Sequence, residues 1–97
     1  MIKINVVDTT LRDGSHTVSH KWSTAEIRKV AGALDEAGIS FIEVGHGDGL
    51  TGSTINYGFS KHTDFELVEA AASVVKKAKV TVLLIPGIGT VEDLQKI

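Results

Sequence analysis

The sequence contains no cysteine among its 97 residues. A disulfide bond and a metal site built from thiolates are therefore both excluded. No apolar run approaches the roughly 18 residues that a membrane-spanning helix needs. The N-terminus lacks the basic segment and the cleavage site of a secretory signal. Together these absences favour a cytoplasmic protein.

A large excess of charge of either sign is also lacking. Ten basic and twelve acidic residues leave a formal net charge of −2. The basic residues are dispersed, apart from a cluster at Lys76, Lys77 and Lys79, whereas nucleic-acid-binding domains usually gather them on one surface. We therefore expect neither a nucleic acid nor a membrane as a partner.

What is present is an alternation of short apolar runs and amphipathic segments, which predicts one domain over residues 1–97. The expected strands cover about 2–7, 41–44 and 79–85, and the expected helices about 24–37, 64–77 and 91–97. Each expected helix opens with a capping box, in which a hydroxyl residue and an acid three residues later bind each other's backbone amides: Ser23 with Glu26, Thr63 with Glu66, and Thr90 with Asp93.

Strands that alternate with helices indicate an α/β fold, with three consecutive βα units around a parallel sheet. Three strands close poorly, because helices on one side leave the other face and both edges of the sheet uncovered. We therefore expect either a homo-oligomer, in which partner copies bury the open face, or a larger protein of which this chain is one piece.

The first strand is followed by a polar loop of unusual composition, DTTLRDGSHTVSH, from Asp8 to His20. In parallel α/β folds, the loops at the carboxyl ends of the strands form the active site. The Arg12 guanidinium is a permanently charged fork that suits a carboxylate or a developing enolate. The Asp13 carboxylate offers hard oxygen ligands for Mg²⁺ or Mn²⁺, and the His16 imidazole can move protons near neutral pH.

Less specific interpretations of this loop remain open. Arg12, Asp13 and Gly14 could form a turn with a surface ion pair. On a helix, Asp13, His16 and His20 would share one face and could hold a metal by themselves, although Gly14 weakens a helix there. We interpret His20 as a loop or packing histidine.

Three stretches together resemble a known family: TLRDGSH, EVGHGDGLTGSTINYGFSKHTDFELVEAA and LLIPGIGTVEDL. The first five letters resemble the metal-dependent aldolase and acyltransferase barrels, and the longer stretches are similar to the 4-hydroxy-2-oxovalerate aldolase branch. The resemblance covers essentially the whole chain but only about the first third of a family member. It therefore implies an incomplete (βα)₈ TIM barrel.

The resemblance also implies an activity, with roles for particular residues. The family cleaves 4-hydroxy-2-oxopentanoate to pyruvate and acetaldehyde in aromatic hydrocarbon catabolism, using Mn²⁺ or another divalent cation such as Mg²⁺ or Co²⁺. By motif, Arg12 would bind the keto acid and stabilise the enolate. Asp13 would ligate the metal beside the substrate, and His16 would remove the 4-hydroxyl proton. Leu83 and Ile85 fall where the family has a stereochemical pocket, although we interpret both as core residues.

The family's other metal ligands form an H-x-H pair on a much later strand, outside this sequence. One carboxylate does not complete the roughly six-ligand shell of a hard divalent ion. We therefore expect the 97-residue chain alone to have no significant aldolase activity. The resemblance further implies an acylating acetaldehyde dehydrogenase as a partner of the intact enzyme.

Two other functions are weighed against the aldolase. The chain could be a non-catalytic, self-associating βαβ module, or its glycine-rich segment 45–52 could bind an anion or a nucleotide. That segment lacks the spacing of a P-loop or a dinucleotide site. Glu43 could lie inside the barrel near the metal, where it is hydrogen-bonded to the first loop, or it could be an ordinary buried carboxylate with a partner. His46 and Asp48 face the expected active-site end without an assigned role.

Overall fold

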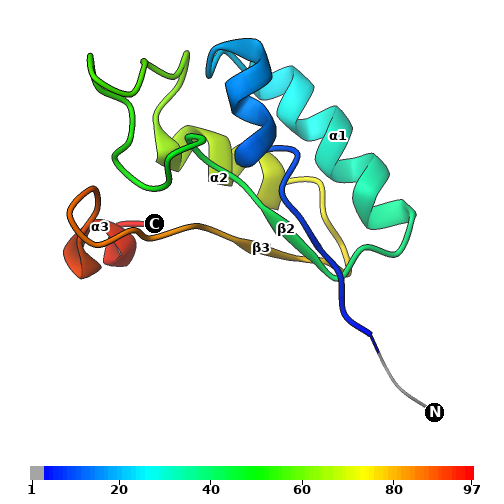
Figure 1. The fold of residues 1–97 in the computed structure, drawn as a ribbon. Helices are drawn as coiled ribbons and strands as arrows, with labels where there is room; N and C mark the ends of the chain where they lie inside the picture. The colour runs from blue at the N-terminus through cyan, green and yellow to red at the C-terminus, as the bar shows by residue number, and fades with distance from the viewer. Residues whose placement is uncertain (1–3) are drawn as a thin grey trace.

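The computed structural model describes residues 4–97 and contains a parallel sheet with the strand order β1-β2-β3 (Figure 1). The strands are β1 (Val7–Asp8), β2 (Phe41–Glu43) and β3 (Lys79–Thr81), and the helices are α1 (Thr24–Glu36), α2 (Asp64–Ala72) and α3 (Val91–Gln95). A short 3₁₀ helix, η1 (Asp13–Val18), lies in the segment that we expected to be an irregular loop. The α/β prediction with three consecutive βα units is confirmed.

Both long helices lie on the same face of the sheet, where they also contact each other (Figure 1). The side chains buried between the helices and the sheet form one core: Leu11, Ile27, Ala31, Ile42, Val44, Leu67, Ala70 and Ala71. Within residues 4–97, no helix covers the opposite face, and Val7 of β1 is half-exposed. The sheet is therefore covered by helices on one face only.

The capping boxes predicted for the three helices are all confirmed. At α1, the Ser23 hydroxyl accepts from the Glu26 amide at 3.1 Å, and the Glu26 carboxylate accepts from the Ser23 amide at 3.1 Å. The same reciprocal bonds begin α2 and α3. Gly38 lies just past the C-cap of α1, and its φ of 89° lets the Ile39 amide bond back to the Leu34 carbonyl. No helix in the described part of the chain is long and apolar enough to cross a membrane.

Helix α2 ends at Ala72, so the prediction that it extends to residue 77 is wrong. The reason is Asp35, at the end of α1, whose carboxylate accepts three backbone N–H bonds. They come from Lys76, Lys77 and Ala78 at 2.8, 3.0 and 2.7 Å. These amides are turned toward α1 and cannot make helical bonds to carbonyls of α2. The Asp35 carboxylate on α1 therefore ends α2 and holds the segment that precedes β3.

The outer strands are shorter than expected, and the remaining bounds agree to within two residues. Residues 2 and 3 of the expected first strand lie outside the described residues, and the ladder itself covers only Val7–Asp8. The third strand ends at Thr81 instead of residue 85. After Glu43 the neighbouring strand gives way to the glycine-rich loop, so residues 82–85 lose their ladder partner. One bond from the Leu50 amide to the Leu83 carbonyl, at 2.9 Å, continues the contact.

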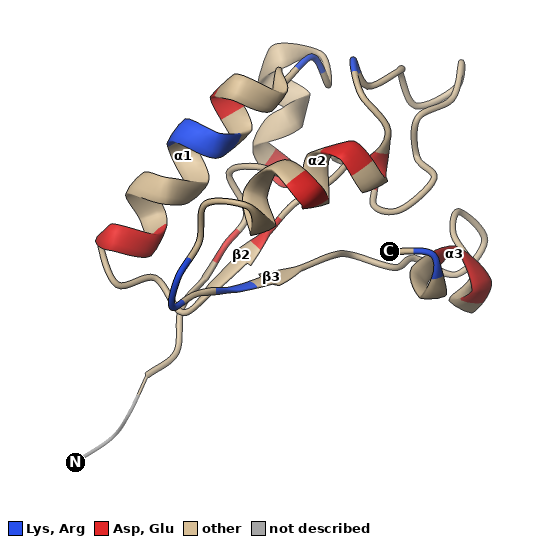
Figure 2. Cartoon of the chain, turned by 180° about the vertical axis from the view of Figure 1, so that it is seen from behind, with Lys and Arg blue, Asp and Glu red and all other residues tan. Residues whose placement is uncertain are grey.

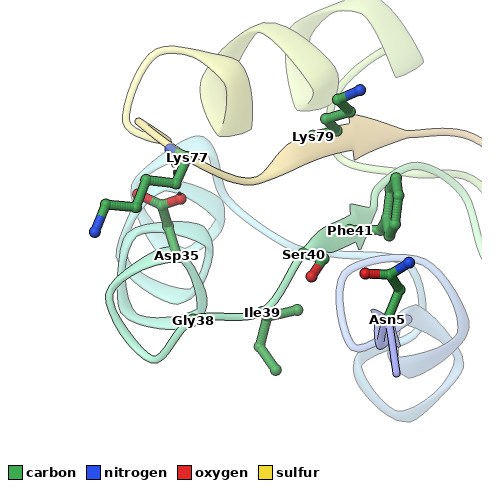
Figure 3. A pocket seen from close by; sticks show the side chains of 8 residues that line it. All are labelled: Asn5, Asp35, Gly38, Ile39, Ser40, Phe41, Lys77 and Lys79. Atoms are coloured by element: carbon green, nitrogen blue, oxygen red, sulfur yellow. Dashed lines mark hydrogen bonds between the residues drawn. The ribbon is translucent and has the colours of Figure 1, made fainter. Parts of the chain in front are cut away.

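A hollow of about 250 Å³ opens at the amino end of the sheet (Figure 3). Asn5, Asp35, Lys77 and Lys79 are among the residues that line it. Both Asp35 oxygens are already bound by backbone amides, and Figure 3 shows the two ammonium groups pointing away from each other. The hollow therefore lacks converging polar groups, unlike the opposite end of the sheet.

Figure 2 shows the charged residues of the chain, with Asp and Glu along α2, and with Lys and Arg on α1, before β3 and near the C-terminus.

We expect Asp35→Asn to lower the melting temperature by several degrees, because an amide replaces the carboxylate that accepts three bonds. Glu36→Gln, on the exposed neighbour, is the matched control. The three backbone donors lower the pKa of Asp35 from its usual 3.8. The stabilisation is therefore complete above that value and is lost as the pH falls through the lower folded-state pKa. Thermal unfolding followed by circular dichroism tests both statements. A gap between wild type and Asp35→Asn that persists unchanged to about pH 2 would contradict the second.

Candidate active site at the carboxyl ends of the strands

The loops that follow β1 and β2 meet at one end of the sheet (Figure 1). The Gly45 amide donates to the Leu11 carbonyl at 3.2 Å, and the buried Ser15 hydroxyl donates to the Gly45 carbonyl at 3.2 Å. These bonds attach η1 to the start of the glycine-rich loop. Arg12, Asp13 and His16 therefore all lie at the carboxyl ends of the strands, where parallel α/β folds place their sites.

Arg12 is held by two groups from the neighbouring β2 unit. Its Nε donates to the Glu43 carboxylate at 2.5 Å, and its terminal Nη1 donates to the Gly47 carbonyl at 3.1 Å. The side chains of Arg12 and Glu43 are only 18% and 15% exposed, so little water competes for this pair. The bond between Glu43 and the first loop that we expected is therefore present, and Arg12 is also the partner that a buried carboxylate requires. The guanidinium thus has a fixed direction with N–H groups to spare.

Asp13 lies beside Arg12 but is largely open to solvent. Its carboxylate is 3.6 Å from Arg12 Nη1, and its side chain is 65% exposed. Among residues 4–97, the one cluster of three potential metal ligands is His16, His20 and Asp48, and it does not include Asp13. The constellation of Asp13 with both histidines is therefore not formed. Asp13 by itself does not fit a complete site for a divalent cation.

Three histidines, His16, His20 and His46, lie close together at the same end of the sheet. His46 is fully buried, and its ring stacks on the ring of His20 with centroids 3.8 Å apart. The ring of His16, which is exposed, meets His20 edge-on at 4.9 Å. His20 is 8% exposed, which agrees with its interpretation as a packing histidine. Burial and the neighbouring His46 and His16 lower the pKa of His20 from 6.5.

His46 organises the glycine-rich loop, a role that the sequence did not suggest. Its Nδ1 accepts from the Asp48 amide at 3.0 Å, so its Nε2 carries the hydrogen that bonds to the Gly58 carbonyl at 2.8 Å. Asp64, at the start of α2, accepts from the amides of His46 and Thr51 at 3.3 and 2.9 Å. The loop's amides are thus bound within the chain, which argues against a phosphate cradle.

The chain matches the HMGL-like family over residues 3–96. It belongs to that family. It is 59% identical over 92 residues to the 4-hydroxy-2-oxovalerate aldolase of Moorella thermoacetica, covering 95% of this chain and 27% of the relative. It is 57% identical over 93 residues to 4-hydroxy-2-oxovalerate aldolase 6 of Rhodococcus jostii, covering 96% and 26%. The chain spans about a quarter of the length of these curated relatives. The resemblance stated from the sequence is confirmed.

Within this HMGL-like chain, Leu83 and Ile85 are partly exposed and lie outside the buried core. Our interpretation of both as core residues is therefore wrong. They follow the end of β3, where the sheet has no cover on one face in residues 4–97. The sequence analysis also did not predict that His20, His46 and Asp48 lie close together. The glycines that alternate with His46 and Asp48 could have indicated this packing, because a glycine leaves room for other side chains to lie against the loop backbone.

Two glycine substitutions test how tightly this HMGL-like loop is packed. A Cβ at Gly52 would lie 2.5 Å from Nδ1 of the buried, hydrogen-bonded His46, so Gly52→Ala should cost about 1–3 kcal/mol of stability. At Gly32, in α1, the nearest side-chain atom is 4.0 Å away. Gly32→Ala should therefore stabilise the chain by about 0.5–1 kcal/mol. Urea unfolding measures both, and equal effects would show that the His46 environment is not rigid.

Proposed function

We propose that this chain is the N-terminal part of a divalent-metal-dependent 4-hydroxy-2-oxovalerate aldolase, with the (βα)₈ barrel of that family. The supporting observation is the fixed Arg12 guanidinium, paired with Glu43 at the carboxyl end of the sheet in a chain 59% identical to a relative of that name. The proposed reaction is retro-aldol cleavage of 4-hydroxy-2-oxopentanoate to pyruvate and acetaldehyde. The substrate class is thus a small keto acid that carries both a carboxylate and a carbonyl group.

Arg12 is proposed to bind this keto acid and to stabilise the enolate. Glu43 and Gly47 occupy two of its five N–H donors, which leaves the others for the substrate. Because the donors are already aimed, no reorganisation is needed as negative charge develops on the C2 oxygen. Glu43 acts as a positioning residue, since it touches the guanidinium and sets its direction.

His16 is proposed to start the cleavage as the general base. Its exposed ring, at the open end of the sheet, would take the proton from the 4-hydroxyl group. The C3–C4 bond then breaks as the C4–O bond becomes the aldehyde carbonyl. The released electron pair forms the pyruvate enolate, which takes up a proton at C3. The reaction thus needs one base and one stabiliser of negative charge.

The cofactor proposed from the family resemblance is Mn²⁺, or another divalent cation such as Mg²⁺ or Co²⁺. Such an ion polarises the keto-acid oxygens when it is bound. Asp13 would supply one ligand, and residues 4–97 do not complete the set, so no step is assigned to the ion here. The partner proposed from the same resemblance is an acylating acetaldehyde dehydrogenase, and the absence of cysteine and of a signal segment favours a cytoplasmic enzyme.

Exchange of this segment into a relative tests the proposed role of Arg12. A chimera that carries this chain in place of the matching part of the Moorella thermoacetica relative should release pyruvate from 4-hydroxy-2-oxopentanoate. Arg12→Lys should lower its kcat/KM about a hundredfold or more, because lysine cannot reproduce the fork. Arg28→Lys, on the exposed face of α1, is the control. A lactate dehydrogenase coupled assay measures both, and similar rates for the two variants would refute the role.

The isolated chain should show no aldolase turnover with Mn²⁺ added, because Asp13 has no companion ligands in residues 4–97. Robust pyruvate release by the purified chain would overturn this expectation. The uncovered sheet face, with Val7 half-exposed, favours a second candidate, a self-associating module. An ordered oligomer in light scattering, together with an inactive chimera, would support the module over the aldolase.

A further inference from the structure

The cluster of His16, His20 and Asp48 has the donor chemistry of a transition-metal site. One ligand atom from each residue lies within 4.8 Å of the other two. Two imidazole nitrogens and one carboxylate oxygen form the mixed set that suits borderline cations such as Zn²⁺ and Co²⁺, whereas Mg²⁺ prefers oxygen alone. We propose that His16, His20 and Asp48 bind such a cation, at a site separate from Asp13.

Gly47 is what allows the two imidazoles to come together. A Cβ at this position would lie 2.7 Å from Nε2 of His16 and 2.8 Å from Cε1 of His20. Any other residue would therefore push the rings away from the space that they share. The Gly47 amide also donates to Nδ1 of His20 at 3.4 Å. Because Nδ1 accepts this bond, it is the nitrogen of neutral His20 that carries a lone pair, and it can bind a cation by giving up this long contact.

The second layer of the cluster is already rigid. His46 stacks on His20 with an interplanar angle of 11°, and its own nitrogens are taken by the Asp48 amide and the Gly58 carbonyl. His46 therefore orients His20 and Asp48 but does not itself ligate. Fixed outer partners of this kind are a general property of metal-binding histidines, because they set the direction of the free nitrogen.

Only a small movement is needed to bind a cation, and it involves the two more exposed residues of the cluster, His16 and Asp48. Ligand atoms around one tetrahedral Zn²⁺ lie about 3.4 Å apart. The His16 side chain is exposed and Asp48 is 30% exposed, so both can shift toward the buried His20. The same exposure leaves room for a water as a fourth ligand. If the proposed function is correct, a cation here occupies the nitrogen that His16 needs as a base and inhibits the aldolase.

The test uses the metal-free 97-residue chain, so it does not depend on aldolase activity. Calorimetric titration with Zn²⁺ should give one bound equivalent, and Co²⁺ should give the visible absorption of a tetrahedral site. His16→Asn and Asp48→Asn should each weaken Zn²⁺ binding by at least about tenfold, since even outer-shell changes cost that much. Both residues are partly or fully exposed, so the variants should fold, which circular dichroism checks.

His62→Asn and Asp13→Asn are the matched controls, because His62 pairs with Glu66 and Asp13 lies outside the cluster. Both should bind Zn²⁺ like the wild type. The ring resonances of His16 and His20 should shift with Zn²⁺ while those of His62 do not. Absence of Zn²⁺ binding, unchanged affinity in His16→Asn and Asp48→Asn, or loss of binding in Asp13→Asn alone would each overturn the proposal.

Discussion

The ion pair between Arg12 and Glu43 is the interaction on which the site depends. The parallel register sets Asp8 of β1 opposite Ile42 of β2, so the residues that follow these two strands arrive at one edge. Arg12 can then bond to Glu43 and to the Gly47 carbonyl, which ties the first loop to the second. Since the pair is mostly shielded from water, its geometry is held firmly. The register of the sheet thus determines the direction in which the Arg12 guanidinium points. The chemistry proposed for the chain depends on that direction.

Local sequence was sufficient to predict where the helices begin, because each capping box lies within four residues. It was insufficient for the end of α2, which is set by Asp35 through a bond to Lys76, 41 residues further along the chain. The same division holds in the site. Arg12, Asp13 and His16 were proposed as site residues from one short motif, whereas the stack of His20 on His46 requires two loops to fold against each other. The length of β3 was overestimated for a similar reason, since its ladder depends on where β2 ends.

The molecule buries apolar surface on one side of its sheet and positions polar chemistry at one end of it. The core between the sheet and the two helices fixes β2, whose central Ile42 is fully buried. Glu43 is the next residue in β2, so its position is fixed by the packing of Ile42. The uncovered face contributes nothing comparable within residues 4–97.

The reciprocal caps of α1, α2 and α3 have a consequence for how the chain can vary. Each helix takes its starting point from its own first residues and not from the length of the loop before it. An insertion in the loop between β2 and α2 would therefore leave the phase of α2 against the core unchanged. The start of each helix is in this way set by local sequence, while Asp64 still ties the loop to α2. New side chains can be sampled at the open end of the sheet without a change in the packing that holds it.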